Sequence, residues 1–204
     1  MSARSEGSPG RSRIHEVEIK LPAADLAAVR ERLGASGARL VSALHFESND
    51  LYDDDDGTFA KAGCMLRVRR TDDGALLTFK GPARFHAGTK TREERETRIS
   101  EPEELQRILE ALGRRPRFHY EKRREEWSLD ECVIALDETP IGSFVEVEGD
   151  PAAIRRVVHE LDFDASESLP YSYPELYARR RREDRSLPVD MTFPDAGGPA
   201  EGKP

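Results

Sequence analysis

The stretch that most constrains the fold runs from His15 to Leu21, where ionisable and apolar residues alternate at every position. Alternation with a period of two predicts a β-strand, because successive side chains point to opposite faces of a sheet. It places Glu16, Glu18 and Lys20 on one face and apolar side chains on the other. A charged strand face usually meets water. The same pattern returns later in the chain, however, and this favours a different interpretation.

The later segments of the chain carry further predicted strands. A hairpin with its turn at residues 72–74 has basic side chains on one face of each strand. The eighth predicted strand, 143–148, has two glutamates on one face and two valines on the other. The segment from Arg92 to Ile99 is polar on both faces, so we expect it at an edge or rim. Residues 83–89 before it are expected to form a mobile loop.

The predicted strands and helices together specify an architecture. Three amphipathic helices each carry one apolar stripe, and they must cover the apolar face of the sheet. The charged faces then point at one another, and an antiparallel sheet of about eight strands curls until it closes around them. We therefore predict an α+β protein, an eight-stranded antiparallel β-barrel with a charged interior and helices packed outside. Its inward bases are Lys20, Arg67, Arg69, Lys80, Arg92, Arg98, Lys122 and Arg124, and its inward acids are Glu16, Glu18, Glu94, Glu96, Glu126, Asp137, Glu146 and Glu148.

Such an interior indicates a ligand. An unpaired buried ion costs several kcal/mol, so each charge must be paired or meet a ligand. Structural salt bridges explain the balance of signs but not two Glu-x-Glu pairs on separate strands. Clustered Lys and Arg suit a polyphosphate, and adjacent carboxylates suit Mg²⁺ or Mn²⁺ that bridges protein and phosphate oxygens. The pattern therefore predicts a polyphosphate and metal site inside the barrel.

Composition excludes several other classes of protein. The net charge of -8 argues against a general binder of nucleic acid or acidic membranes. Cys64 and Cys132 lie far apart without metal-ligand spacing, so we expect neither a zinc site nor a disulfide. The sequence contains no signal-peptide pattern and no apolar run long enough for a transmembrane helix, so we expect a cytoplasmic protein.

The chain of 204 residues is large enough for one domain with a core. We expect this domain at residues 14–183. Residues 1–13 are expected to form a disordered N-terminal tail, and residues 184–204 a disordered C-terminal tail, because Pro, Gly and Asp dominate there.

Glu16-Val-Glu18-Ile-Lys20 opens a series of motifs that spans residues 14–178. The later motifs are Leu66-Arg67-Val68-Arg69, Thr78-Phe79-Lys80-Gly81-Pro82, Arg92-Glu93-Glu94-Arg95-Glu96, Lys122-Arg123-Arg124, Leu136-Asp137 and Gly142-Ser-Phe-Val-Glu146-Val-Glu148. In this order they resemble the CYTH superfamily of triphosphate tunnel metalloenzymes. That superfamily includes class IV adenylyl cyclases, thiamine triphosphatases and inorganic triphosphatases. One departure is that Glu47 and Ser48 precede Asp50 and Tyr52, where the family often has a glutamine.

The resemblance implies a tunnel that binds a triphosphate through basic side chains and holds Mg²⁺ or Mn²⁺ through acidic ones. It implies phosphate contacts from Lys20, Arg67, Arg69, Lys80, Lys122 and Arg124, and the charged-face pattern adds Arg92 to this substrate-binding set. It implies metal ligands at Glu16, Glu18, Glu146 and Glu148, with Glu94, Glu96 and Asp137 as metal ligands or orienting groups. The candidate catalytic residues among the bases are Lys20, Arg69, Lys80 and Lys122.

Two reactions fit this site: hydrolysis of an inorganic or organic triphosphate, and cyclisation of ATP to cyclic AMP and pyrophosphate. No motif decides between them, because both displace phosphate or pyrophosphate from a metal-bound triphosphate. We place hydrolysis first, since it needs only room for water, whereas cyclisation must also clamp the ribose.

A non-catalytic nucleotide or polyphosphate-binding module is a third hypothesis. The expected partner is inorganic triphosphate, ATP or thiamine triphosphate, with neither nucleic acid nor a membrane. A monomer and a homodimer both remain open.

Overall fold

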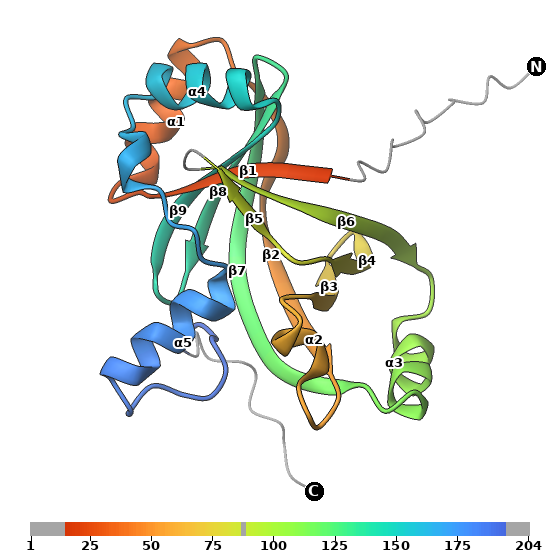
Figure 1. The fold of residues 1–204 in the computed structure, drawn as a ribbon. Coiled ribbons are helices and arrows are strands. Elements are labelled where there is room, and N and C mark those ends of the chain that lie inside the picture. The colour runs from red at the N-terminus through yellow and green to blue at the C-terminus, as the bar shows by residue number, and fades with distance from the viewer. Residues whose placement is uncertain (1–14, 87–88, 195–204) are drawn as a thin grey trace, which may run out of the picture.

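The computed structural model describes residues 15–86 and 89–194, and Figure 1 shows their fold. The strands are β1 (His15–Pro22), β2 (Arg39–Asp53), β3 (Met65–Thr71), β4 (Gly74–Lys80), β5 (Arg84–His86), β6 (Thr89–Ile99), β7 (Arg115–Leu129), β8 (Cys132–Thr139) and β9 (Gly142–Glu148). The helices are α1 (Leu26–Ala35), α2 (Thr58–Lys61), α3 (Pro102–Ala111), α4 (Pro151–Glu160) and α5 (Tyr173–Glu183), with a short 3-10 helix at Ala165–Glu167.

The strands form one antiparallel sheet that closes on itself. Their order is β1-β9-β8-β7-β2-β3-β4-β6-β5, and β1 also pairs with β6. That pairing joins His15–Glu18 of β1 to Lys90–Glu93 of β6. The result confirms the predicted eight-stranded barrel, and β5 is an additional short strand paired with the start of β6.

The largest hydrophobic core lies outside the barrel wall, between the sheet and two helices. The apolar faces of β1, β8 and β9 pack beneath α1 and α4, which lie side by side at one end of the molecule (Figure 1). Asp25 begins α1 by accepting hydrogen bonds from the backbone N–H groups of Ala27 and Ala28. Asp150 accepts from Ala152 at the start of α4. The apolar faces thus point outward, as predicted, and the charged faces point inward.

Two smaller cores complete the outer layer. Leu105 and Leu109 of α3 pack on Val68 of β3 and its neighbours. Tyr173 and Tyr177 of α5 belong to a second cluster that includes aromatic residues of β7 and β9. No helix in the described part of the chain is long and apolar enough to cross a membrane.

The edge or rim position expected for residues 92–99 is confirmed for residues 94–99, which in the described part of the chain pair with β4 on one side and with no strand on the other. It is wrong for residues 92 and 93, which pair with β1. The strand β6 is polar on both faces because one face lines the interior, while Glu93 and Arg95 on the other face form an exposed ion pair at 2.6 Å. The loop expected at 83–89 is also partly wrong, since residues 84–86 form β5. Residues 87 and 88 of that loop lie outside the described residues.

The predicted C-terminal tail begins too early. Met191 is completely buried, and its backbone N–H donates to the carbonyl of His119 at 3.0 Å while its carbonyl accepts from Glu121 at 2.9 Å. The Tyr177 hydroxyl lies 3.0 Å from the Pro188 carbonyl. The sequence predicts disorder for this segment because Pro, Gly and Asp dominate it. A few apolar side chains, however, pack against β7 and α5. The tail predicted at 1–13, and residues 195–204 of the other, lie outside the described residues.

Candidate active site

The inward faces of the barrel surround a cavity of about 550 Å³. The strands reach it through side chains at alternate positions, as the period-two pattern predicted. Every predicted site residue except Asp137 lines this cavity, and their roles in binding and catalysis remain predictions. The lining residues from the predicted set are Glu16, Glu18, Lys20, Arg67, Arg69, Lys80, Arg92, Glu94, Glu96, Lys122, Arg124, Glu146 and Glu148.

Acids and bases are concentrated on different strands around this cavity. The two Glu-x-Glu pairs lie on neighbouring strands, β1 and β9, and the register places Glu18 opposite Glu148. The strands β7 and β3, on either side of β2, carry the Lys-x-Arg and Arg-x-Arg pairs. The sheet order therefore separates an acidic wall, centred on β1 and β9, from a basic wall, formed by the inward side chains of β7 and β3 with β2 between these two strands.

Lys80 joins two acidic side chains at the side of the cavity nearest β6. Its Nζ lies 2.8 Å from Glu16 Oε2 and 2.8 Å from Glu94 Oε2. Burial alone would lower the pKa of Lys80, but these two carboxylates raise it above its ordinary value. Lys90 binds Glu18 in the same way, at 2.8 Å. The two carboxylates beside Lys80 thus keep that lysine charged.

Glu146 is held by bases from two other strands. Its Oε1 lies 3.0 Å from Lys20 Nζ, and its Oε2 accepts from Arg124. Burial would raise the pKa of the Glu146 carboxyl, but the charges of Lys20 and Arg124 hold it well below its ordinary value. Glu146 is therefore a carboxylate at neutral pH.

Asp137 lies behind the cavity lining and is completely buried. Its two oxygens accept from Arg124 Nε at 2.7 Å and Nη2 at 2.6 Å, and from the Tyr173 hydroxyl at 2.6 Å. Lys122 Nζ lies 3.3 Å away. With its acceptors already engaged, Asp137 fits the orienting role better than that of a metal ligand.

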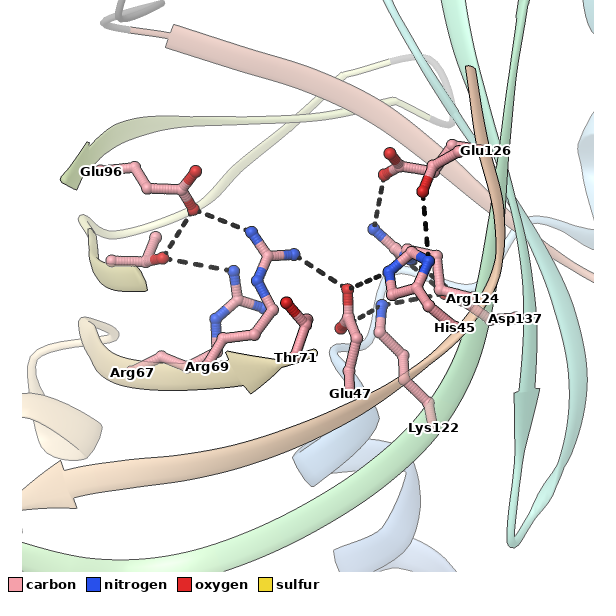
Figure 2. Close-up of polar contacts among 12 residues, drawn as sticks. His45, Glu47, Arg67, Arg69, Thr71, Glu96, Lys122, Arg124, Glu126 and Asp137 are labelled. Carbon is pink, nitrogen blue, oxygen red and sulfur yellow. Dashed lines mark hydrogen bonds and ion pairs between the residues drawn. The ribbon is translucent and has the colours of Figure 1, made fainter. Parts of the chain in front are cut away.

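Sequence reasoning did not assign Glu47, which lies on β2 between the two strands of the basic wall. Figure 2 shows its carboxylate between Arg69 and Lys122, with His45 beside it. It is 1% exposed. Burial would raise the pKa of the Glu47 carboxyl, but the charge of Lys122 and the nearby His45 hold that pKa well below its ordinary value.

Three further residues at the site were also not assigned a role. Lys90 lies on the same face of β6 as Arg92. It was not assigned because the predicted strand starts only at Arg92, after the loop expected at 83–89. Tyr120 lies two residues before Lys122, on the same face of β7, and also lines the cavity. Tyr173 enters from α5, and its ring lies 3.6 Å from Lys20 Nζ as a cation–π partner. No strand period could indicate Tyr173, because it belongs to a helix.

A second cavity of about 500 Å³ adjoins the first. Met65, Lys90 and Arg92 line both cavities, so the two are neighbours. The second cavity is more apolar, with aromatic walls from Phe85 and Phe118. It offers space for an apolar group next to the charged interior.

Four carboxylates of the cavity have the chemistry that a divalent cation needs. Glu16, Glu18, Glu146 and Glu148 supply carboxylate oxygens, which are the ligands Mg²⁺ and Mn²⁺ prefer, on two adjacent strands. Across residues 15–86 and 89–194, however, no three or more acidic, His or Cys side chains already form a metal-binding group. The donor chemistry fits a metal, but Glu16, Glu18 and Glu146 now pair with bases, which must move away for a metal to bind there.

Comparison with known proteins identifies the class to which this barrel belongs. A model of the CYTH domain matches residues 15–170, and the chain therefore belongs to the CYTH family. Over 134 residues it is 30% identical to a Methanocaldococcus jannaschii protein named "Putative adenylate cyclase MJ0240", which covers 65% of this chain and 75% of that protein.

Two solved structures share the fold. The protein PH1819 of Pyrococcus horikoshii OT3 superimposes with a TM-score of 0.68 at 25% identity, covering 81% of this chain and 99% of that one. HpAC1 of Hippeastrum, an adenylyl cyclase candidate described as having a dominant triphosphatase activity, gives a TM-score of 0.60 at 18% identity, over 86% and 99% of the two chains. Both similarities support the barrel assignment.

Proposed function

We propose that the protein is a divalent-metal-dependent triphosphatase that binds its substrate inside the barrel. The observation that carries this proposal concerns three buried guanidinium groups. In the part of the chain that the structure describes, the Nε donors of Arg67, Arg69 and Arg92 are buried without a hydrogen-bond acceptor. A buried donor without an acceptor costs about 1–3 kcal/mol. A polyphosphate supplies many anionic acceptors, so these arginines support a polyphosphate as the ligand.

The ion pairs around the cavity explain why a metal should accompany the triphosphate. Phosphate oxygens compete with Glu16 and Glu94 for Lys80, and with Glu146 for Lys20. When the bases turn to phosphate, the carboxylates lose their partners, and an unpaired buried carboxylate is costly. Glu16, Glu18, Glu146 and Glu148 would then hold Mg²⁺ or Mn²⁺. We therefore expect triphosphate and metal to strengthen each other's binding.

The bases have a clear part in such a reaction. Arg69, Lys80 and Lys122 would contact the phosphate oxygens and stabilise the charge that develops on the departing phosphate, since they are already in place before the reaction. The bound metal would neutralise phosphate charge and lower the pKa of a water molecule. Burial of these bases in the barrel strengthens their interaction with the substrate.

Adenylyl cyclisation is a second candidate, and the 30% identity to the M. jannaschii protein favours it. The apolar cavity beside the charged one could accommodate a nucleoside or another organic group. Organic as well as inorganic triphosphates are therefore candidate substrates.

One assay separates these possibilities. The purified protein is incubated with Mg²⁺ or Mn²⁺ and, in turn, inorganic triphosphate, ATP and thiamine triphosphate, and the products are separated by chromatography. Phosphate release supports the triphosphatase, whereas cyclic AMP and pyrophosphate from ATP support the cyclase. Tight binding without cleavage of any of the three would contradict both and indicate a binding module.

A further inference from the structure

We propose that Glu47 is a positioning residue of this site, which aims Lys122 and Arg69 at the phosphates and affects turnover through them. The inference rests on the proposed function. Glu47 is an acidic residue that contacts two of the bases proposed to bind the phosphates. An acid in this position is unexpected, because its charge repels an anionic ligand.

The position of Glu47 follows from the sheet order. β2 lies between β7 and β3, and the register places Glu47 directly opposite Lys122. On the other side of β2, Asn49 lies opposite Arg69. Glu47 is thus within reach of a base from each neighbouring strand.

The carboxylate of Glu47 contacts both bases. Its Oε1 accepts from Arg69 Nη1 at 3.1 Å, and its Oε2 lies 3.4 Å from Lys122 Nζ. His45 Nε2 lies 3.6 Å from Oε1 as a third neighbour. Figure 2 shows that these three side chains approach the carboxylate from different directions.

Each of the two bases also has a second carboxylate. Lys122 Nζ lies 3.3 Å from Asp137, and Arg69 Nη2 donates to Glu96 at 3.0 Å. Each base is therefore held between two anions, and this orders two long side chains that would otherwise lose rotamer freedom only when the phosphate binds. Bases that are already ordered can stabilise a transition state without first being rearranged.

A simple counter-charge role predicts a different outcome. A carboxylate about 3 Å from the bases also repels an incoming phosphate, so its charge weakens substrate binding. If Glu47 only balances charge, then its neutralisation strengthens triphosphate binding and leaves kcat unchanged. If Glu47 positions the two bases, then its neutralisation lowers kcat even where KM falls.

The test uses two variants of Glu47 and one control. Glu47→Gln keeps the shape but presents an amide, which cannot attract both bases, and Glu47→Asp keeps the charge but shortens its reach. Glu138→Gln is the matched control, because Glu138 pairs with Arg123 at 3.7 Å on the outer face of the barrel. We expect kcat with the best substrate of the assay above to fall on the order of 100-fold in Glu47→Gln. Glu47→Asp should lose part of kcat, and Glu138→Gln none.

A second measurement does not depend on turnover. Lys122 is 2% exposed, so in the wild-type protein its ammonium protons should exchange slowly enough with water to give an NMR signal. This signal should disappear in Glu47→Gln and persist in Glu138→Gln. An unchanged kcat in both Glu47 variants, or a persistent Lys122 signal in Glu47→Gln, would overturn the proposal. Failure of the wild-type protein to cleave any triphosphate would refute the proposed function instead, and the Lys122 signal would still test the positioning.

Discussion

Asp137→Asn should destabilise the barrel strongly. Asp137 is completely buried and receives hydrogen bonds from Arg124 and Tyr173, with Lys122 also close by. Asparagine has nearly the same volume but replaces one acceptor oxygen with an N–H₂ donor, which faces other donors. Two buried bases then lose a shared negative charge.

The size of the effect follows from what the two bases retain. Removing one member of a buried ion pair costs about 3–5 kcal/mol. Arg124 keeps Glu146 as a partner, and Lys122 keeps Glu47. We therefore expect a loss near the lower limit, about 3 kcal/mol of unfolding free energy. For a chain of this length, this corresponds to a fall in Tm of roughly 6–12 °C.

Urea denaturation followed by circular dichroism measures this loss, with Glu138→Gln as the control. Glu138 is the next residue on the same strand but lies on the outer face, in a partly exposed ion pair with Arg123. Its replacement should cost less than about 1 kcal/mol. If the two variants lose the same amount of stability, then the contacts of Asp137 with Arg124 and Lys122 do not stabilise the fold.

Three further predictions concern the ligand and pH. Lys122→Ala should weaken binding of inorganic triphosphate by about 1.5–3 kcal/mol in calorimetry, the value of a charge-assisted contact, and unchanged affinity would mean that Lys122 does not bind phosphate. Glu148→Gln should raise the Mn²⁺ concentration needed for half-maximal activity, and an identical half-saturation in both proteins would remove Glu148 from the metal ligands. The hydrogen bond with Asp50 raises the pKa of His119 above its ordinary value. Protonated His119 therefore stabilises the folded protein below about pH 6.5, and this contribution should be lost as the pH rises through the folded-state pKa. Unfolding free energies at about pH 6 and 8 should differ less in His119→Gln than in wild type; some slope should persist, because the pKa of His45 is raised as well.

The strand period accounts for most of what could be predicted. Glu16 and Glu18 face the cavity because their strand alternates without interruption, and the same reasoning correctly placed Arg67 and Arg69 on β3. β2 gave a weaker signal, because apolar and polar residues mix on both of its faces around Glu47. Its register with β7 is also interrupted by irregularities at residues 40–45.

Other features depend on contacts between distant parts of the chain. Tyr173 reaches Asp137 from a helix that follows β8 by more than thirty residues. The burial of Met191 depends on aromatic residues of β7 and α5. A local pattern contains no information about such partners, so the polar residues around Met191 indicated a tail where the folded chain forms a docked segment.

The closing strand has a consequence for synthesis of the protein. Among the strands that the structure describes, β1 is the first, yet its partner on the acidic wall is β9, the last. While the ribosome is still producing the middle of the chain, β1 has no β9 to pair with. The alternating charges of β1 should then keep its unpaired edge hydrated and discourage pairing with strands of other nascent chains. Glu18 meets Glu148 only when β9 has emerged, so a polypeptide that stops before β9 lacks half of the acidic wall.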